Sequence, residues 1–271
     1  MKSQKLPVKG INDSLSSPAS GGIRLNKAIA SAGLCSRRKA DELILKGLVC
    51  VNGQVAQEMG LRILPERDII TVEGTALPTV AVKRVWLALY KPVQVVCTAH
   101  DPDGRTTVLD ILPEKWKTKR LFPVGRLDYF SEGLVLMTND GDSAQHILHP
   151  RYEVPRSYHV LVREKPTAAM LESMSAGMRL AEGERLAPVR VRTLPSSSVL
   201  TPLSAQAFLL EIILVQGLNR QIRRMCRDLG LTILRLVRVS HGPVQLGDLK
   251  PGELRELLPH ELAAVRLENL N

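Results

Sequence analysis

One stretch of this chain decides the fold of its larger part: Gly125-Arg126-Leu127-Asp128-Tyr129-Phe130-Ser131-Glu132-Gly133-Leu134-Val135-Leu136-Met137-Thr138. An apolar run that follows turn residues is typical of a strand buried on both faces, so we predict such a strand at Leu134–Thr138. The two glycines allow the preceding loop to turn tightly. The loop therefore holds Arg126 and Asp128 in fixed positions beside a buried strand. Their spacing by itself favours the alternative, an ordinary surface turn.

The residues around this strand predict one domain that spans 85–271. Further strands are expected at Val85–Leu89, Val93–Cys97, Ser157–Val162, Ala187–Arg192, Ala207–Val215 and Ile233–Val239, with Pro92 as a bend between the first two. Helices are expected at Ser143–Leu148, Thr167–Ser175, Arg220–Leu229 and Pro259–Leu267. Because the strands occur in runs and do not alternate strictly with helices, the pattern favours an α+β fold with a mixed, mainly antiparallel sheet over a doubly wound fold.

A separate small α/β domain is predicted at 23–80, after a polar tail at 1–22. Its expected elements are helices at Leu25–Gly33 and Ser36–Gly47, a hairpin at Val49–Val55, a closing strand at Ile69–Val72 and a linker at Thr79–Arg84. Ser36 has the side chain of a helix N-cap. Asn52-Gly53, between alternating apolar residues, is the strongest local pattern for a two-residue hairpin turn.

The charge of the chain favours a polyanionic partner. Its 37 lysines and arginines exceed its 27 aspartates and glutamates by 10, and neutralising phosphates releases condensed counterions. A small anionic substrate is the alternative that composition leaves open. Aromatic residues make up only 3% of the chain, which argues against a binding surface built from many base-stacking rings.

Neither a membrane segment nor a metal site is expected. No apolar run approaches the roughly 18 residues that span a bilayer, and residues 1–22 lack the apolar core of a secretory signal, so we expect a cytoplasmic protein. The four cysteines form no Cys-x-x-Cys pair, which indicates reduced thiols. His146 and His149 share a helical face without an evident third ligand.

Basic residues gather at the two N-terminal helices: Arg24, Lys27, Arg37, Arg38 and Lys39. A charge run is usually a solvated face, but cations in a first helical turn oppose the helix dipole, and a phosphate partner would reverse that cost. Together with Gly33, Ser36, Gly47 and Asn52-Gly53, these residues resemble the S4-type RNA-binding domain. The resemblance implies that this domain binds structured RNA through these five cations.

The loop and strand at 125–141 resemble the Gly-Arg-Leu-Asp signature of the pseudouridine synthases of the RsuA, RluB, RluE and RluF group. This resemblance implies that Asp128 is the essential carboxylate and that Arg126 enters the RNA helix as the target nucleotide leaves it. Breaking the bond from C1′ to N1, turning the uracil and bonding C1′ to C5 involves no redox change, so no cofactor is expected. Asp128 can attack C1′ or remove the C2′ proton, and sequence does not choose between the two.

Two further segments extend the resemblance. Asn219-Arg220-Gln221-Ile222-Arg223-Arg224-Met225 matches a family motif in which Arg223 pairs with the catalytic aspartate, and Asn219, Arg220, Gln221 and Arg224 are expected to contact RNA. Val154-Pro155-Arg156-Ser157-Tyr158-His159-Val160 matches a Lys-x-Tyr-x-Val pattern whose tyrosine stacks on the uracil. Arg156 replaces the usual lysine and is also expected to contact RNA. An ordinary core position remains the alternative for Tyr158.

The resemblance implies an enzyme that isomerises uridine in ribosomal RNA or in a ribosomal precursor particle, and it favours 23S over 16S rRNA. A monomer is expected, because nothing in the sequence demands more. Two rivals have different chemistry. A non-catalytic ribosome assembly factor would be expected to have lost Asp128, Tyr158 or Arg223, and all three are present. A glycoside hydrolase could use Asp128 and Glu132 as its carboxylate pair, but few aromatic rings are available to bind sugars.

Overall fold

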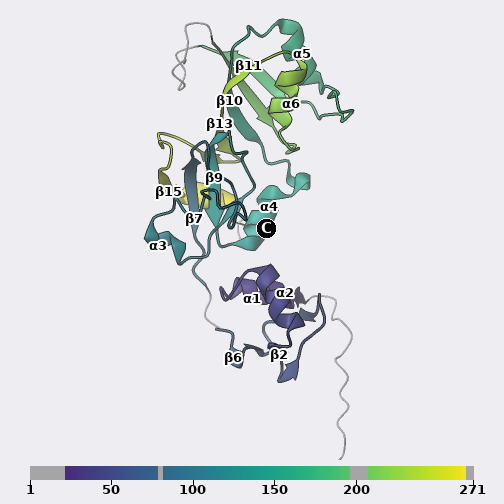
Figure 1. The fold of residues 1–271 in the computed structure, drawn as a ribbon, viewed down its shortest axis with the longest axis vertical. Coiled ribbons are helices and arrows are strands. Elements are labelled where there is room, and N and C mark those ends of the chain that lie inside the picture. The colour runs from purple at the N-terminus through teal and green to yellow at the C-terminus, as the bar shows by residue number, and fades with distance from the viewer. Residues whose placement is uncertain (1–21, 79–81, 196–206, 267–271) are drawn as a thin grey trace, which may run out of the picture. The chain divides into compact units, whose positions relative to one another are not determined.

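The computed structural model describes residues 22–78, 82–195 and 207–266. The chain divides into two compact units, Met1–Lys83 and Arg84–Asn271, which are described separately (Figure 1). Apart from Gly22, the predicted tail lies outside the described residues, as do residues 79–81 of the predicted linker.

The N-terminal unit consists of two helices and short strands. The elements are β1 (Ile23–Arg24), α1 (Leu25–Ser31), α2 (Arg37–Leu45), β2 (Val49–Val51), β3 (Gln54–Val55), β4 (Arg62–Ile63), β5 (Ile70–Val72) and β6 (Thr75–Ala76). As predicted, the Ser36 side chain caps α2 by accepting a hydrogen bond from Lys39 N, 3.2 Å away. Asn52 and Gly53 have φ of 52° and 80°, which confirms the predicted hairpin turn.

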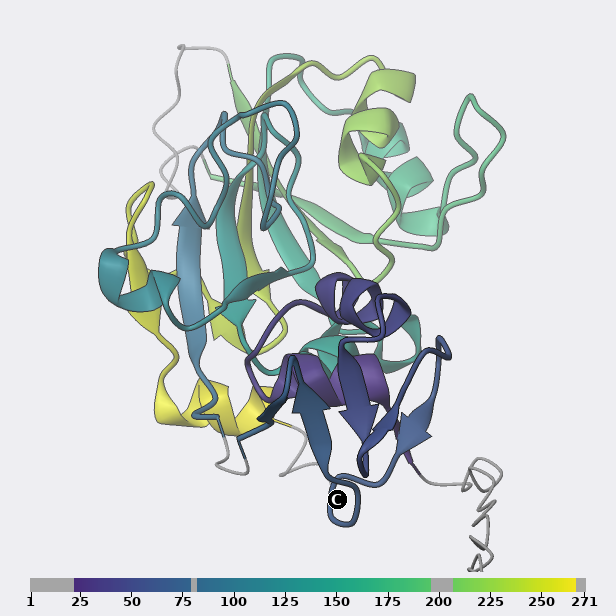
Figure 2. The ribbon, with the colours of Figure 1, turned by 60° about the horizontal axis from the view of Figure 1, so that its bottom comes forward.

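The small sheet has the order β3-β2-β5-β6, and its core is shared with both helices, which Figure 2 shows beside it. The prediction that Ile69–Val72 closes this sheet is wrong, because β6 pairs with β5 and forms the edge. Glu73 and Gly74 both have positive φ and turn the chain back. A glutamate is not a typical residue for such a turn, so the hairpin has a weak sequence signal.

The C-terminal unit is built on one large sheet. Its central order is β11-β12-β10-β13-β9-β7-β15, with β8 beside β9 and β14 beside β13. The strands are β7 (Trp86–Lys91), β8 (Phe122–Val124), β9 (Glu132–Thr138), β10 (Arg156–Val162), β11 (Arg190–Leu194), β12 (Phe208–Leu214), β13 (Ile233–His241), β14 (Val244–Gln245) and β15 (Leu254–Glu256). The pair of β13 and β9 is parallel and the other pairs are antiparallel, which confirms the predicted mixed, mainly antiparallel sheet.

Strand β9 is buried along its whole length, as the apolar run predicts. Leu134 and Leu136 belong to one hydrophobic cluster, whereas Val135 and Met137 belong to another. Since neighbouring side chains of a strand point to opposite faces, both faces of β9 are covered.

Helices cover the sheet: α3 (Glu114–Lys117), α4 (Gly141–Leu148), the 3₁₀ turn η1 (Pro150–Tyr152), α5 (Ala168–Ala176), α6 (Gln221–Asp228) and α7 (Pro259–Val265). Helices α4 and α7 contribute Ala144, Ile147 and Val265 to the cluster around Leu134. Helices α5 and α6, which lie near β10 and β11 in Figure 1, contribute to a cluster of their own with β10 and β12.

Two predicted strands need correction. Residues Val93–Cys97 form no strand, because Gln94 has a φ of 62° and only Val96 makes an isolated bridge, to Thr107. The predicted strand at Ala187–Arg192 lies further along, at Arg190–Leu194. The short strands β8, β14 and β15 were not predicted, since two or three residues give too little alternation to detect.

Gly133 allows β9 and β13 to pair closely, and we expect Gly133→Ala to destabilise this unit. Gly133 has a φ of 105°, and a Cβ atom there would lie 2.4 Å from Arg238 O and 2.7 Å from Arg238 N. Strain and overpacking together should lower the free energy of unfolding by at least about 2 kcal/mol in a urea titration. Gly141→Ala is the control, because nothing lies within 4 Å of a Cβ atom there. Equal stability of the two variants would contradict the prediction.

Candidate active site

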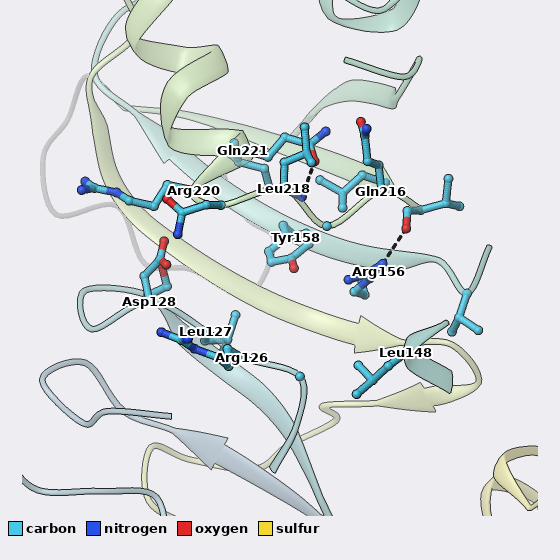
Figure 3. Close-up of a pocket in the computed structure, with 18 of the residues that line it drawn as sticks. Arg126, Leu127, Asp128, Leu148, Arg156, Tyr158, Gln216, Leu218, Arg220 and Gln221 are labelled. Carbon is cyan, nitrogen blue, oxygen red and sulfur yellow. Dashed lines mark hydrogen bonds between the residues drawn. The ribbon is translucent and has the colours of Figure 1, made fainter. Parts of the chain in front are cut away.

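A pocket of about 680 Å³ opens in the C-terminal unit. Three segments provide most of its lining: residues 125–128 and Ser131 of the loop before β9, residues between 147 and 158 from the end of α4 into β10, and residues 214–223 from β12 into α6. Leu236 of β13 also lines it. Figure 3 shows that the labelled residues of these segments lie around one space. Residues far apart in the sequence are therefore brought together around a cavity large enough for a nucleoside.

Asp128 and Arg223 meet at this pocket. Arg223 Nε lies 3.7 Å from Asp128 Oδ2, and the Asp128 side chain remains 37% exposed. The Arg223 Nη2 group donates hydrogen bonds to Phe130 O at 2.8 Å and to Ser131 Oγ at 2.9 Å. One guanidinium thus faces the carboxylate and also fixes the loop that carries it.

The amphipathic pattern of α6 directs Arg223 to this position. Ile222, Met225 and Cys226 are buried in the cluster shared with β10 and β12, so Arg223 lies at the border of that buried face. Burial lowers the pKa of the Arg223 guanidinium, whereas the charge of Asp128 raises it. An arginine stays protonated in either case, so the pocket keeps its cation.

Residues 91–97, at and after the end of β7, help to fix the loop that carries Asp128. Gln94 N donates to Tyr129 O at 2.7 Å, and Cys97 Sγ lies 3.5 Å from Gly125 O. Lys91 is fully buried and donates to Pro92 O and Val95 O, both at 2.8 Å. Burial lowers the pKa of Lys91 to about 8, while the charges of Cys97, Asp128 and Glu132 oppose this shift.

Sequence reasoning missed Lys91. The available signal was a lysine at the end of a strand whose other residues are apolar, directly before Pro92. Such a lysine must keep hydrogen bonds when it is buried.

Tyr158 lies in the middle of the pocket, between Asp128 and Arg156 in the view of Figure 3. The ring is half-buried and packs against two hydrophobic clusters. Tyr158 therefore contributes to the core and also lines the pocket. Between Ser157 and Tyr158 the register with β13 shifts by one residue, which is a β-bulge. The bulge places Tyr158 opposite Arg238, and within the described residues no side chain is seen to hydrogen-bond the tyrosine hydroxyl.

Arg156 forms one end of the pocket. Its Nη2 donates to Val215 O at 2.5 Å, and burial lowers its pKa. Gly217 lies so close that a Cβ atom there would be 2.7 Å from Arg156 Nη1. The Arg156 guanidinium, which is predicted to contact RNA, is therefore already fixed at the pocket wall.

The other residues predicted to contact RNA have different environments. Arg126, Asn219 and Arg220 line the pocket and are exposed. Gln221 is buried, and its Oε1 accepts a hydrogen bond from Leu218 N at 3.2 Å. Arg224 is mostly buried and forms ion pairs with Glu184 and Glu182, so its charge is already engaged within the protein.

The basic residues of the N-terminal unit lie at its helices. Arg24, Arg37, Arg38 and Lys39 are exposed, and Lys27 is half-buried. Lys39 forms an ion pair with Glu42 at 3.0 Å, which is one residue of the same helix.

Glu132 does not pair with Asp128 as a second catalytic carboxylate. It is 7% exposed, and Arg235 holds both of its oxygens at 2.6 and 3.0 Å. The Tyr90 hydroxyl donates to it at 2.8 Å, and burial raises the pKa of Tyr90 to about 12. Because Glu132 is held in this closed ion pair, it is not available as the second carboxylate that a glycoside hydrolase would need.

Two other expectations concern metal ions and membranes. The His146 ring stacks on Tyr152 at 3.5 Å, and His149 Nδ1 accepts from Arg151 N. Over residues 22–78, 82–195 and 207–266, no group of three or more potential metal ligands occurs. No helix in these ranges has the length and apolar character needed to cross a bilayer.

Comparison with known proteins gives a consistent result. Residues 85–228 match the family described as RNA pseudouridylate synthase, and residues 23–69 match the S4 domain. Ribosomal large subunit pseudouridine synthase B of Bacillus subtilis (strain 168) is 38% identical over 243 residues, which are 90% of this chain and 95% of that protein. The dual-specificity RNA pseudouridine synthase RluF of Escherichia coli (strain K12) is 37% identical, with coverages of 89% and 77%.

A solved structure agrees with this result. A crystal structure described as pseudouridylate synthase superposes with a TM-score of 0.63 and 26% identity, covering 90% of this chain and all of that one. The matches confirm the resemblances to the S4 domain and to the pseudouridine synthases on which the sequence predictions rest.

His241, which lies opposite Arg156 where β13 pairs with β10, should make the protein sensitive to acid. It is 1% exposed, and burial together with Arg238 and Arg156 lowers its pKa well below the usual value. The folded state keeps it neutral, whereas the unfolded state takes up a proton below pH about 6.5, so stability is lost as the pH falls. Between pH 7 and pH 5, the wild type should lose about 2 kcal/mol more in urea unfolding than His241→Gln.

The control for this experiment is the exposed His260, because His260→Gln should keep the pH dependence of the wild type. His159, whose pKa burial also lowers, is present in all three proteins and cancels in the comparison. Equal slopes for the wild type and His241→Gln would show that His241 is not the responsible group.

Proposed function

The chain belongs to the RNA pseudouridylate synthase family, and from this premise we propose that it isomerises a uridine of large-subunit (23S) ribosomal RNA. The 3.7 Å pair of Asp128 and Arg223 at the pocket is the observation that carries this proposal. The large-subunit target is supported by the names of the relatives from Bacillus subtilis and, at lower coverage, Pseudomonas aeruginosa.

The two units have different tasks in this proposal. The S4 domain binds structured RNA through Arg24, Lys27 and the cations Arg37–Lys39 at the start of α2. The unit from residue 84 onward carries out the chemistry. The net charge of the whole chain, +10, favours association with RNA.

The target uridine must leave the RNA stack to reach Asp128, since its glycosidic bond is inaccessible in a helix. Arg126 is exposed at the pocket beside Asp128 and is suited to fill the position that the base leaves. The flipped uracil then lies against Tyr158, whose ring forms part of the pocket wall. Asn219 and Arg220 line the pocket and are exposed, and in this proposal they contact the phosphates of the strand.

Asp128 starts the reaction on the sugar. In one route its carboxylate bonds to C1′ as the bond from C1′ to N1 breaks, and in the other it removes the C2′ proton. The free uracil turns in the pocket and C5 bonds to C1′, while the bond from Asp128 to C1′ breaks in the first route or the proton returns to C2′ in the second. The proton at C5 then leaves, and N1, which has lost its bond to C1′, takes up a proton. Arg223 stabilises the Asp128 carboxylate when it is ionised, before the first step and after the last, and Tyr158 is the group suited to accept the C5 proton. Atoms balance without a cofactor.

The runner-up is a ribosome assembly factor that binds RNA without reacting. The charge pair and the fixed loop around Asp128 disfavour it, because a pure binding protein does not need a partly exposed carboxylate in a basic pocket. We further propose that the protein acts as a monomer in the cytoplasm, on rRNA or on a precursor particle, and that 16S rRNA is the alternative substrate.

Asp128→Asn should abolish the reaction, because it removes the charge with little change in shape. Release of tritium from rRNA labelled at uridine C5 should fall by at least about 10²- to 10⁴-fold. Asp248→Asn, at an exposed position outside the pocket, should retain activity. Parallel assays with 23S and 16S rRNA, and with precursor particles, identify the substrate. If no tritium is released from 23S rRNA, 16S rRNA or precursor particles, the enzyme proposal is wrong and the assembly-factor alternative is favoured.

Arg223→Lys should lower kcat more than it raises KM. A lysine keeps the charge but cannot reach Asp128, Phe130 O and Ser131 Oγ together. Losing charged hydrogen bonds of roughly 1.5–3 kcal/mol corresponds to a fall in kcat of about 10- to 150-fold. Arg227→Lys is the matched control, since Arg227 lies on the same helix and pairs with Glu182 away from the pocket. Equal rates for the two variants would contradict the role of Arg223.

A further inference from the structure

Phe130 is exposed at an unusual place. It lies two residues after Asp128 and is 65% exposed, more than any other large apolar side chain in the described part of the C-terminal unit. The other two phenylalanines of the chain, Phe122 and Phe208, pack against hydrophobic clusters. Neither the catalytic proposal nor the core of the protein uses the Phe130 ring.

The exposure is not the result of a loose loop. Phe130 O accepts a hydrogen bond from Arg223 at 2.8 Å, and Tyr129 O accepts one from Gln94 N at 2.7 Å. On the other side, Ser131 is 1% exposed, and its backbone N donates to Asp128 O at 3.0 Å. The backbone is fixed before, at and after Phe130, so the exposed ring extends into solvent from a rigid backbone.

The ring itself is also oriented. Its centroid lies 5.0 Å from that of Tyr129, with an interplanar angle of 77°, which is an edge-to-face contact. Such a contact restricts the ring while most of its surface stays free. A rigid, open aromatic ring is suited to stacking, since little conformational freedom is lost when a second ring arrives.

The position of the Phe130 side chain determines which base of the RNA can stack on it. Asp128 lines the pocket, whereas Phe130 does not, although two residues span at most about 7 Å. A uridine whose C1′ lies at Asp128 occupies the pocket, so the next nucleotide of the strand lies outside it, within reach of the exposed Phe130 ring two residues from Asp128. Arg126 and Arg220 are exposed at the same pocket and attract the phosphates of that strand.

We propose that Phe130 is a stacking platform for the base adjacent to the flipped uridine and thereby positions the RNA strand over Asp128. This inference rests on the proposed function. Every base has a π-face, so the contact tolerates different sequences and adds affinity without reading a base edge. Phe130 is a positioning residue, because it does not touch the reacting atoms.

The test compares Phe130 variants on the rRNA for which the wild type releases tritium. Phe130→Ala should raise KM with little change in kcat and lower kcat/KM by roughly 5- to 150-fold, the range expected for one base–aromatic stack. Phe130→Leu should be equally impaired, whereas Phe130→Tyr and Phe130→Trp should restore KM. Leu258→Ala removes an apolar side chain that is 47% exposed elsewhere in this unit and should behave as wild type.

A coupling experiment then identifies the base. After the modified uridine has been mapped, an abasic nucleotide is placed on its 5′ or its 3′ side in a synthetic RNA fragment. If Phe130 stacks on that base, Phe130→Ala should cause no further loss with one of the two abasic fragments. A persistent loss with both fragments would overturn the proposal.

Other results also discriminate. Full activity of Phe130→Ala, or of Phe130→Leu, would exclude stacking. A loss of kcat alone would indicate a disturbed Asp128 loop and would likewise overturn the proposal. If the wild type releases no tritium, the proposed isomerisation fails, but filter binding of the same rRNA still tests Phe130: weaker binding by Phe130→Ala would keep the stacking role, and equal binding would remove it.

Discussion

The close approach of Gly133 on β9 to Arg238 on β13 is the contact on which the site depends. The two strands are parallel there, and only a residue without a side chain fits between them. Strand β13 also pairs with β10, which carries Tyr158. Because the Asp128 loop leads directly into β9, this one backbone contact sets the position of the carboxylate relative to the tyrosine.

The same region contains buried cations whose nearest partners are neutral. Lys91 donates to two carbonyl groups, and Arg238 Nε donates to Leu134 O at 2.6 Å. Burying a charged group whose hydrogen-bond partners are neutral raises the energy of the free protein. A phosphate backbone that arrives at the pocket compensates part of this positive field, so an arrangement that is costly for folding favours binding of a polyanion.

The sequence predicts the features that depend on local chemistry. Ser36 caps a helix, Asn52-Gly53 makes a hairpin, and the run after Gly133 is a strand buried on both faces, because each is determined within a few residues. The motifs also identify Asp128 and Arg223 as neighbours. The features that the sequence does not predict depend on contacts with residues far away along the chain.

Three features show this dependence. The bulge that aims Tyr158 exists only against β13, and the two-residue strand β14 exists only because β13 is beside it. The burial of Lys91 follows from packing of the 94–97 segment under the loop, and that segment looks like a strand in the sequence. Tertiary contacts override the local pattern in each case.

The scarcity of aromatic residues has a different meaning once the loop is seen. A chain with 3% aromatic residues cannot cover a surface with stacking rings, so its specificity for RNA must come from few, well-placed groups. Arg223 fixes the backbone at Phe130 and Ser131 with the same guanidinium that faces Asp128. The residue that faces the carboxylate therefore also fixes the backbone of the one exposed phenylalanine of the described chain, and the proposed catalysis and strand positioning share a single rigid loop.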